Sequence, residues 1–217
     1  CLVGSEMCIR DSVWDVEKGV PSECQDKAWQ TCSCLGTWHY NRSAYEDNWY
    51  KSAETVIHML IDIVSKNGNL LLSVPMKGNG TIDDKEEKIL EDIAAWMEVN
   101  GEGIFDTRPW CIYGEGPSTE TAIPLDGAGF NEGKNAPYTS ADIRFVKKGK
   151  YLYAHIMKWP SDGKIQIKSL AIGSPYCKGE IEKVELLGGG KAKFRRTSKG
   201  LLIDLPKDLS LIHISEP

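Results

Sequence analysis

The residues best suited to binding chemistry in this sequence are aromatic, and they gather between Val13 and Tyr50. Irregular segments seldom concentrate aromatic rings unless the rings pack tightly or line a site. Sugars present flat apolar C–H faces on which a tryptophan ring can lie, so this segment is a candidate sugar-binding surface. The alternative is that the rings cover the end of a sheet. The rings are Trp14, Trp29, Trp38, Tyr40, Tyr45, Trp49 and Tyr50.

Residues that could bind a metal do not form a recognisable site. Cys24, Cys32 and Cys34 are close in the sequence, but there is no C-x-x-C pair and no second pair beside them. A disulfide among these three cysteines remains an open alternative. The glycine-rich loop after Pro75 matches part of a calcium-binding loop, but Pro75 and Lys77 would occupy two of its ligand positions. We therefore expect no metal and no cofactor.

Composition restricts the classes of partner. The chain has 217 residues, of which 41% are hydrophobic and 26% are charged, and its net charge is −5. These values are typical of a globular protein and do not favour nucleic acid as a partner. The basic run Lys191–Arg196 is interpreted as a solvated strand face. No apolar run approaches the ~20 residues that cross a bilayer, so we expect no membrane span.

One helix and one strand lie at the centre of the pattern, between Ser52 and Pro75. Ser52 is the predicted N-cap of a helix whose apolar residues recur at helical spacing. Asn67 and Gly68 tolerate a left-handed backbone and are expected to end that helix. The unbroken run Leu70–Leu72 then predicts a strand buried on both faces, as in a parallel sheet. This unit is typical of an α/β fold.

A second helix is predicted after the glycine-rich loop. Asp83 and Glu86 form a capping box at its start, and Asn100-Gly101 is expected to end it. Its predicted buried stripe consists of Ile89, Leu90, Ile93, Ala94 and Met97.

The pattern changes after Ile104. The stretch Gly114–Gly133 is rich in Gly, Pro, Ser and Thr and is expected to be a linker or long surface loop. Short alternating runs separated by turn signals then predict a β-sandwich, with the domain boundary near Thr107–Gly116. The fold class is therefore α/β followed by all-β. The predicted strands are Ile143–Lys147, Tyr151–Trp159, Lys164–Leu170, Ile181–Leu187, Lys191–Thr197 and Leu201–Leu205.

The two ends differ from their neighbours. Residues 1–12 and 210–217 show no periodicity and resemble translated sequencing-adapter sequence, so both are excluded from the fold prediction. A single parallel strand cannot form a sheet alone, and a full (β/α)₈ barrel needs about 250 residues. We therefore expect residues 13–106 to be the last part of a larger domain, followed by a sandwich over residues 107–209.

Four blocks, in order, resemble the α-L-fucosidases of glycoside hydrolase family 29. The resemblance extends over nearly all of the chain between its two ends. The blocks are Trp29–Thr31 with Trp38–Tyr40, then Asp62–Pro75, then Glu98–Ile104 with Thr107–Trp110, and finally Ile143–Gly149 with Leu152–Ala154 and Trp159-Pro160.

The resemblance implies the carboxyl-terminal part of a (β/α)₈-like catalytic barrel followed by a β-sandwich. It implies a retaining exo-α-L-fucosidase that removes terminal α-L-fucose from glycans through a covalent intermediate. The family also implies a periplasmic or secreted location and a fucosylated glycan as partner. The Asp nucleophile of the family lies on an earlier barrel strand with no counterpart here, so we expect the chain alone to be inactive.

The resemblance also assigns site residues. Many members have Glu where this chain has Gln30, and an amide cannot donate and recover a proton. Glu17, in a run that resembles another family block, is therefore the candidate acid/base, with Glu23 as a weaker one; the alternative is that Glu17 is a surface loop residue. Trp29, Gln30, Trp38 and His39 are the candidate substrate-binding residues, although His39 could instead be structural.

Two other functions remain open. The chain could be a non-catalytic carbohydrate-binding protein, because Tyr151, Tyr153 and Trp159 are expected to share one face of the sandwich. That face could equally pack against the barrel. The chain could also belong to a glycosidase of different sugar specificity, since a fold alone does not fix the substrate.

Overall fold

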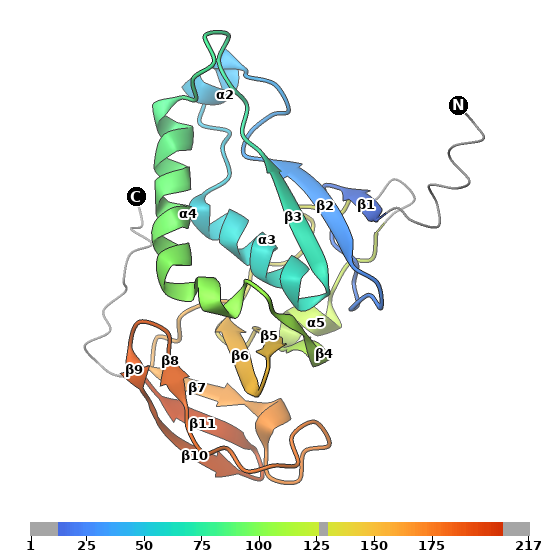
Figure 1. Cartoon of the computed structure of the whole chain (residues 1–217), viewed down its shortest axis with the longest axis vertical. Helices are drawn as coiled ribbons and strands as arrows, with labels where there is room; N and C mark the ends of the chain where they lie inside the picture. Colours follow the sequence, from blue (N-terminus) through green and yellow to red (C-terminus); the bar gives the residue numbers. More distant parts are fainter. Residues whose placement is uncertain (1–12, 126–129, 206–217) are drawn as a thin grey trace, which may run out of the picture.

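The computed structural model describes residues 13–125 and 130–205. The segments 1–12 and 210–217, predicted to be foreign, lie outside these residues, and so does the predicted end of the sandwich at residue 209. Figure 1 shows a mixed α/β part above a strand-rich part, in the order that the sequence predicts. Within the described residues, none of the helices is long and apolar enough to cross a membrane.

The α/β part contains a parallel sheet of three strands. These are β1 (Trp14–Glu17), β2 (Trp29–Cys34) and β3 (Gly68–Ser73), in that spatial order. The prediction of an irregular segment before Tyr50 was therefore wrong, because this segment contributes two of the three strands. β1 and β2 contain carboxylate, amide, hydroxyl and thiol side chains, which hid their alternation.

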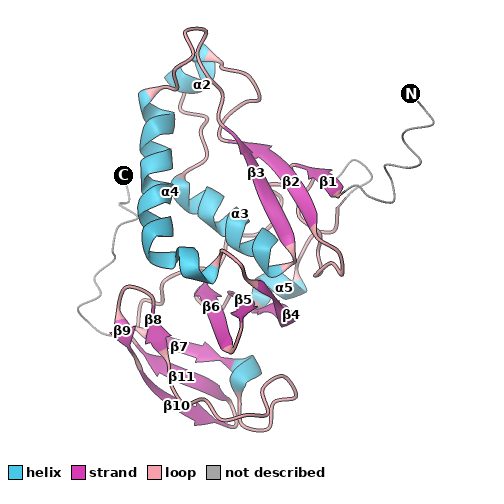
Figure 2. Ribbon diagram, in the orientation of Figure 1, coloured by secondary structure: helices cyan, strands magenta, loops and turns pink. Residues whose placement is uncertain are grey.

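Helix α3 (Ala53–Ser65) joins β2 to β3 and covers one face of the sheet (Figure 2). The Ser52 hydroxyl accepts a hydrogen bond from the Thr55 amide, which confirms the predicted N-cap. Asn67 follows with a φ of 71°, a left-handed conformation that ends the helix as predicted. A short helix, α2 (Arg42–Glu46), precedes α3 in the same connection.

Helix α4 (Asp84–Asn100) begins with the predicted capping box between Asp83 and Glu86. It packs on α3 through a cluster that contains Ile57, Ile61 and Ile93. The predicted stripe is only half-buried, and Ala94 is exposed, which corrects that prediction. A single 3₁₀ turn, η1 (Gly101–Gly103), continues from the end of α4.

The other face of the parallel sheet is open. Leu71 points to this face and is 58% exposed, while Leu70 packs toward α3 with Trp29 and Val16. Burial of this strand on both faces was therefore a wrong prediction for the chain as it stands. The physical reason is that α3 covers only one of the two faces.

The strand-rich part is the predicted β-sandwich, and two antiparallel three-stranded sheets enclose its core. One sheet has the order β4 (Arg108–Glu115), β5 (Ile143–Lys148) and β6 (Tyr151–Ile156). The other has the order β10 (Lys193–Thr197), β11 (Gly200–Asp204) and β7 (Lys164–Ile167). The remaining elements are α5 (Pro117–Glu120), η2 (Lys168–Leu170) and the ribbon of β8 (Glu185–Leu186) with β9 (Gly190–Lys191).

The sandwich differs from its prediction in several places. Strand β4 was not predicted, because Pro109 and Gly114 interrupt its apolar pattern. The predicted strand Ile181–Leu187 is reduced to two residues in β8. Strand β6 ends at Ile156, so Trp159 lies beyond the strand and the expected alternation with Tyr153 fails.

A buried ion cluster joins the two parts. Asp62 of α3 forms ion pairs with Lys66 at 2.9 Å and with Arg144 of β5 at 2.6 Å. Both cations also lie over the ring of Tyr113 in β4. Burial alone would raise the pKa of Asp62, but Lys66 and Arg144 outweigh it and lower that pKa. The sandwich is therefore attached to α3 through charges as well as apolar contacts.

Candidate active site

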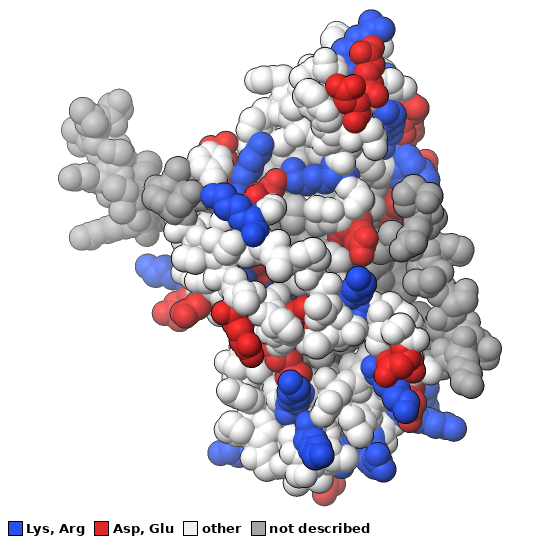
Figure 3. Space-filling view, turned by 180° about the vertical axis from the view of Figure 1, so that it is seen from behind, with Lys and Arg blue, Asp and Glu red and all other residues white. Residues whose placement is uncertain are grey.

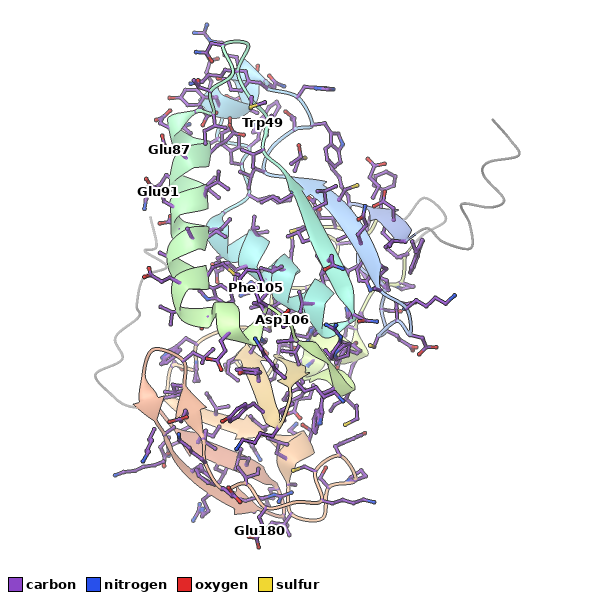
Figure 4. The ribbon with its side chains drawn as sticks, viewed as in Figure 1. Trp49, Glu87, Glu91, Phe105, Asp106 and Glu180 are labelled. Carbon is purple, nitrogen blue, oxygen red and sulfur yellow. The ribbon has the colours of Figure 1, made fainter. Side chains whose placement is uncertain are left out.

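The carboxyl ends of the three parallel strands lie together at one edge of the sheet. β1 ends at Glu17, β2 at Cys34 and β3 at Ser73, and these ends point away from the sandwich (Figure 2). Figure 4 shows Trp49, from the loop after β2, at this end of the molecule, and Glu180 of the sandwich at the opposite end. Enzymes built on parallel α/β sheets place their chemistry at the carboxyl edge.

Alternation places two carboxylates on the open face. Val16 points toward α3, so its neighbours Asp15 and Glu17 point to the opposite face, where both are exposed. Gln30 of β2 lies opposite Asp15 and donates its amide hydrogen to the Asp15 carboxylate over 3.0 Å. The structure thus brings the predicted residues Glu17 and Gln30 to one face and adds Asp15, which the sequence analysis missed. The signal was the spacing of two between the carboxylates.

Glu17 occupies the last position of β1, and its carboxylate has no hydrogen-bond partner among the described residues. Its strand neighbour Cys32 lies on the same face. Burial and the negative charges of Asp15 and Glu17 raise the pKa of the Cys32 thiol. A proton-transferring group must be accessible and free of competing bonds, and Glu17 is exposed and unbonded to the other described residues.

Glu23 does not share this location. The chain leaves β1 and returns toward the start of β2, where the Gln25 amide donates to the Lys66 carbonyl at the end of α3. Glu23 lies two residues before Gln25 and is exposed. It therefore belongs to the amino end of the sheet, away from Glu17.

Trp29 is a core residue. It is 1% exposed and packs against Ile63, and its indole N–H donates to the Lys66 carbonyl over 2.9 Å. A Cβ on Gly68 would lie 2.5 Å from its ring, so the neighbouring strand can approach only because residue 68 is glycine. This burial argues against the predicted sugar contact of Trp29.

Trp38 and His39 lie in the loop after β2, at the carboxyl edge, and both side chains are exposed. The Lys18 ammonium, from the loop after β1, lies 5.1 Å from the centre of the Trp38 ring. The His39 imidazole has no hydrogen bond within the described residues. The structure therefore brings Trp38 and His39 to the edge where Glu17 ends its strand, and their contact with a sugar stays a prediction.

Tyr50 anchors the loop that carries Trp38 and His39. The Tyr50 hydroxyl donates to Asp83 at the start of α4 over 2.6 Å, and the Tyr50 ring lies against Gly36. Burial and the neighbouring Asp83 carboxylate raise the pKa of Tyr50, so its hydroxyl remains a donor across the physiological range. Tyr50 consequently has a structural role, in line with the alternative that some rings of this segment pack on the sheet.

Two residues far along the chain also reach this edge. Asn131 bonds to the backbone of Val20, and Glu132 bonds to Ser33, Lys51 and the backbone of Lys18. The sequence analysis placed them in a linker, and no local signal could have linked them to β1.

Cysteine and metal chemistry is not evident at this site. The five cysteines within residues 13–125 and 130–205 are free thiols, so the open disulfide among Cys24, Cys32 and Cys34 does not form. No group of three or more His, Cys, Asp or Glu side chains in these ranges could hold a metal ion.

Comparisons with known proteins agree on one family. Residues 3–102 match the family model described as α-L-fucosidase, and residues 136–215 match the model described as the α-L-fucosidase C-terminal domain. The plasma α-L-fucosidase of Rattus norvegicus is 31% identical over 192 residues, which cover 86% of this chain and 36% of that protein. The tissue α-L-fucosidase of Homo sapiens is 25% identical over 195 residues, which cover 88% and 36%.

Solved structures give the same result. A structure described as an α-L-fucosidase superposes with a TM-score of 0.68 and 26% identity over 90% of this chain and 39% of that chain. The Thermotoga maritima α-fucosidase in complex with fucose superposes with a TM-score of 0.63 and 26% identity over 89% and 39%. The chain spans 36% of the length of the two curated relatives named above, from Rattus norvegicus and Homo sapiens.

Proposed function

We propose, from the premise that this chain belongs to the α-L-fucosidase family, that it supplies the carboxyl-terminal barrel strands and the sandwich of a retaining exo-α-L-fucosidase. One observation carries the proposal: the two family models match the two structural parts of the chain in order. The substrate would be a glycan with terminal α-L-fucose. Export to the periplasm or beyond belongs to the same proposal and rests on the family alone.

The open face of the sheet gives Glu17 the role of acid/base in this proposal. A retaining glycosidase needs two carboxyl groups about 5 Å apart, one to attack the anomeric carbon and one to protonate the leaving oxygen and then activate water. Glu17 is exposed at the end of β1 and is unbonded to other described side chains. Asp15 is already held by the Gln30 amide, and we assign the nucleophile to no residue of this chain.

Trp38 and His39 would contact the sugar. An indole ring offers an apolar surface to the C–H face of fucose, and an exposed imidazole can bond to a hydroxyl. Both residues lie on the loop after β2, beside the end of β1. The Thr37 hydroxyl donates to the His39 carbonyl over 2.6 Å, which fixes the backbone from which the imidazole projects.

The test is hydrolysis of aryl α-L-fucosides by a protein that contains this chain and the upstream barrel strands. Glu17→Gln should lower kcat/KM about 10²- to 10⁴-fold for a poor leaving group. The loss of kcat/KM should be much smaller for dinitrophenyl fucoside, because dinitrophenolate leaves without being protonated. Glu23→Gln is the matched control and should retain activity. An equal loss of kcat/KM for both leaving groups would exclude Glu17 as the acid/base. Turnover by the 217-residue chain alone would contradict the expectation that it lacks the nucleophile.

A non-catalytic glycan-binding function is the second candidate, and the sandwich face that suggested it is largely covered. The Tyr153 hydroxyl donates to Glu102 over 2.5 Å, and the His155 ring bonds to the Gly103 carbonyl over 3.0 Å. Both partners belong to the turn η1, so this face packs against the α/β part. Tyr151, by contrast, is 59% exposed.

The sandwich does contain a surface pocket of about 330 Å³ beside Arg196. The Arg196 guanidinium already donates to the carbonyls of Leu170, Ala171, Cys177 and Gly179, so it has little capacity left for a ligand. Figure 3 shows Lys and Arg side chains interspersed with Asp and Glu on one face of the molecule. An NMR titration of the full chain with fucose separates the two functions, because shifts confined to the sandwich would favour the second candidate.

A further inference from the structure

Between α5 and β5, Leu125 packs with Val16 and Trp29 of the parallel sheet, and Asn131 bonds to Val20 after β1. Its residues Asn131 and Glu132, here called the clamp, contact the loop that follows β1. This loop begins at Lys18, directly after Glu17, and the Lys18 ammonium lies over the Trp38 ring. A part of the chain more than a hundred residues away therefore reaches the candidate active site.

Asn131 binds the backbone of this loop as a neighbouring strand would. It is 2% exposed, and its carboxamide oxygen accepts a hydrogen bond from the Val20 amide over 2.9 Å. Its carboxamide nitrogen donates to the Val20 carbonyl over 2.9 Å and to the Ile123 carbonyl over 2.7 Å. All three bonds are partly buried, so leaving these backbone groups unpaired would be costly.

Glu132 binds Lys18, the first residue of the loop, and Ser33 near the end of β2. Its backbone amide donates to the Lys18 carbonyl over 2.9 Å. Its carboxylate accepts a hydrogen bond from the Ser33 hydroxyl over 2.5 Å and forms an ion pair with Lys51 at 2.8 Å. Both carboxylate oxygens are therefore occupied, so Glu132 is unsuited to proton transfer and suited to holding its neighbours.

Lys18 has the backbone conformation that needs such support. Its φ is 47°, in the left-handed region that residues with a Cβ seldom adopt. Its amide donates to the Cys32 carbonyl and its carbonyl accepts from the Glu132 amide, both over 2.9 Å. Strained residues of this kind persist only where the surroundings determine them, and they gather at functional sites.

We propose that Asn131 and Glu132 are positioning residues of the candidate active site. They hold the left-handed turn at Lys18, which aims the Lys18 ammonium over Trp38 and fixes the end of the strand that presents Glu17. The catalytic consequence of this positioning rests on the proposed function, whereas the geometry can be measured without any enzymatic activity. The clamp then supports the site from the face of the sheet that α3 covers, where Glu132 bonds to Ser33, and it is not part of a linker.

A double-mutant cycle tests the link between the clamp and the strain. Asn131→Ala/Glu132→Ala removes the side-chain bonds that anchor the Glu132 backbone amide beside Lys18. Lys18 can then relax, and this relief offsets part of the lost stability. In a Lys18→Gly background there is no strain to relieve, so the same removal should be more harmful. We expect its effect on the unfolding equilibrium constant to be larger in that background by a factor of roughly 5 to 30.

The measurement is urea unfolding of the 217-residue chain in all four variants of the cycle. The effect of Lys18→Gly on the unfolded chain cancels within the cycle. Asn135→Ala is the matched control, because the Asn135 side chain accepts its hydrogen bond from the Ile123 amide and not from the loop after β1. Its effect should be equal in both backgrounds. Equal effects for the clamp variant would overturn the proposal.

A spectroscopic signature gives a second and independent reading. The Trp38 ring should shift the ε-methylene protons of Lys18 upfield, and Trp38→Leu should abolish this shift and so assign it. The clamp variant should lose the shift and Asn135→Ala should retain it. If the clamp variant does not fold, Glu132→Gln loses only the ion pair with Lys51 and should reduce the shift. A shift unchanged in the variant that is measured would overturn the positioning role, and it would leave the hydrolase proposal untouched.

Discussion

The parallel sheet and the two antiparallel sheets of the sandwich differ in how their faces are covered. In the sandwich, Ile143 and Phe145 of β5 are fully buried between two antiparallel sheets. In the parallel sheet, α3 covers one face and the other exposes Leu71 to 58%. The sandwich therefore completes its own core within this chain, while the parallel sheet does not.

The difference separates the face that carries the proposed site from the part that completes its own core. The open face of the parallel sheet bears Asp15, Glu17 and Gln30, the polar groups that could act on a sugar. In a barrel this face would look into the interior, near the active site. The sandwich face that bears Tyr153 and His155 packs on the α/β part.

The largest expected effect concerns the contact between the two regions. Asp62→Asn leaves the buried cations of Lys66 and Arg144 without a counter-charge, which should lower the free energy of unfolding by about 3 to 5 kcal/mol. The matched control is Asp92→Asn, which removes the exposed partner of Lys88 at the same i,i+4 spacing and should change it by less than about 0.5 kcal/mol. Urea unfolding measures both. Similar losses of unfolding free energy for Asp62→Asn and Asp92→Asn would show that the buried Asp62 cluster does not stabilise the contact between the regions.

The next effect compares the two sheets directly. Ile143→Ala removes fully buried methyl groups and should lower the free energy of unfolding by about 2 to 4 kcal/mol. Leu71→Ala removes a similar volume from an exposed position and should change it by less than about 0.5 kcal/mol. Thermal unfolding of both variants is the measurement. A large loss for Leu71→Ala would mean that the open face is covered in solution.

A smaller effect follows from pH at the interface. Burial lowers the pKa of His155, and its bond to the Gly103 carbonyl opposes this only in part. Below the ordinary value of 6.5 the unfolded chain takes up a proton that the folded chain resists, so stability should fall as the pH falls from about 7 to 5. The loss should be at most about 1.4 kcal/mol per pH unit from this residue, and His155→Gln should reduce the slope. Burial also lowers the pKa of His58, so part of the slope should remain.

The smallest expected effect on stability comes from the candidate sugar surface. Trp38→Ala should change the free energy of unfolding by less than about 0.5 kcal/mol, because its ring is 38% exposed and contacts a surface lysine. Trp29→Ala should instead lose about 3 to 5 kcal/mol, because that ring is buried. Thermal unfolding distinguishes the two tryptophans. Equal losses would contradict the division into a packing ring and a surface ring.

The sequence by itself determined the features that depend on neighbours within a few residues. The cap at Ser52 and the capping box of Asp83 with Glu86 form as predicted, because their partners lie three residues away. Most sandwich strands were predicted because alternation is a local pattern. The family was identified in the same way, from short runs such as Asp62–Pro75.

Only the tertiary structure decided the site. Parallel pairing joins strands that are far apart in sequence, so the register that brings Gln30 to Asp15 cannot be derived from local pattern. The same holds for Trp29, which faces α3 and is buried while Trp38, nine residues later, is exposed. Asp62 and Arg144 are separated by 82 positions, and Val20 and Asn131 by 111. Such contacts depend on how two packed regions meet, and that is a property of the whole fold.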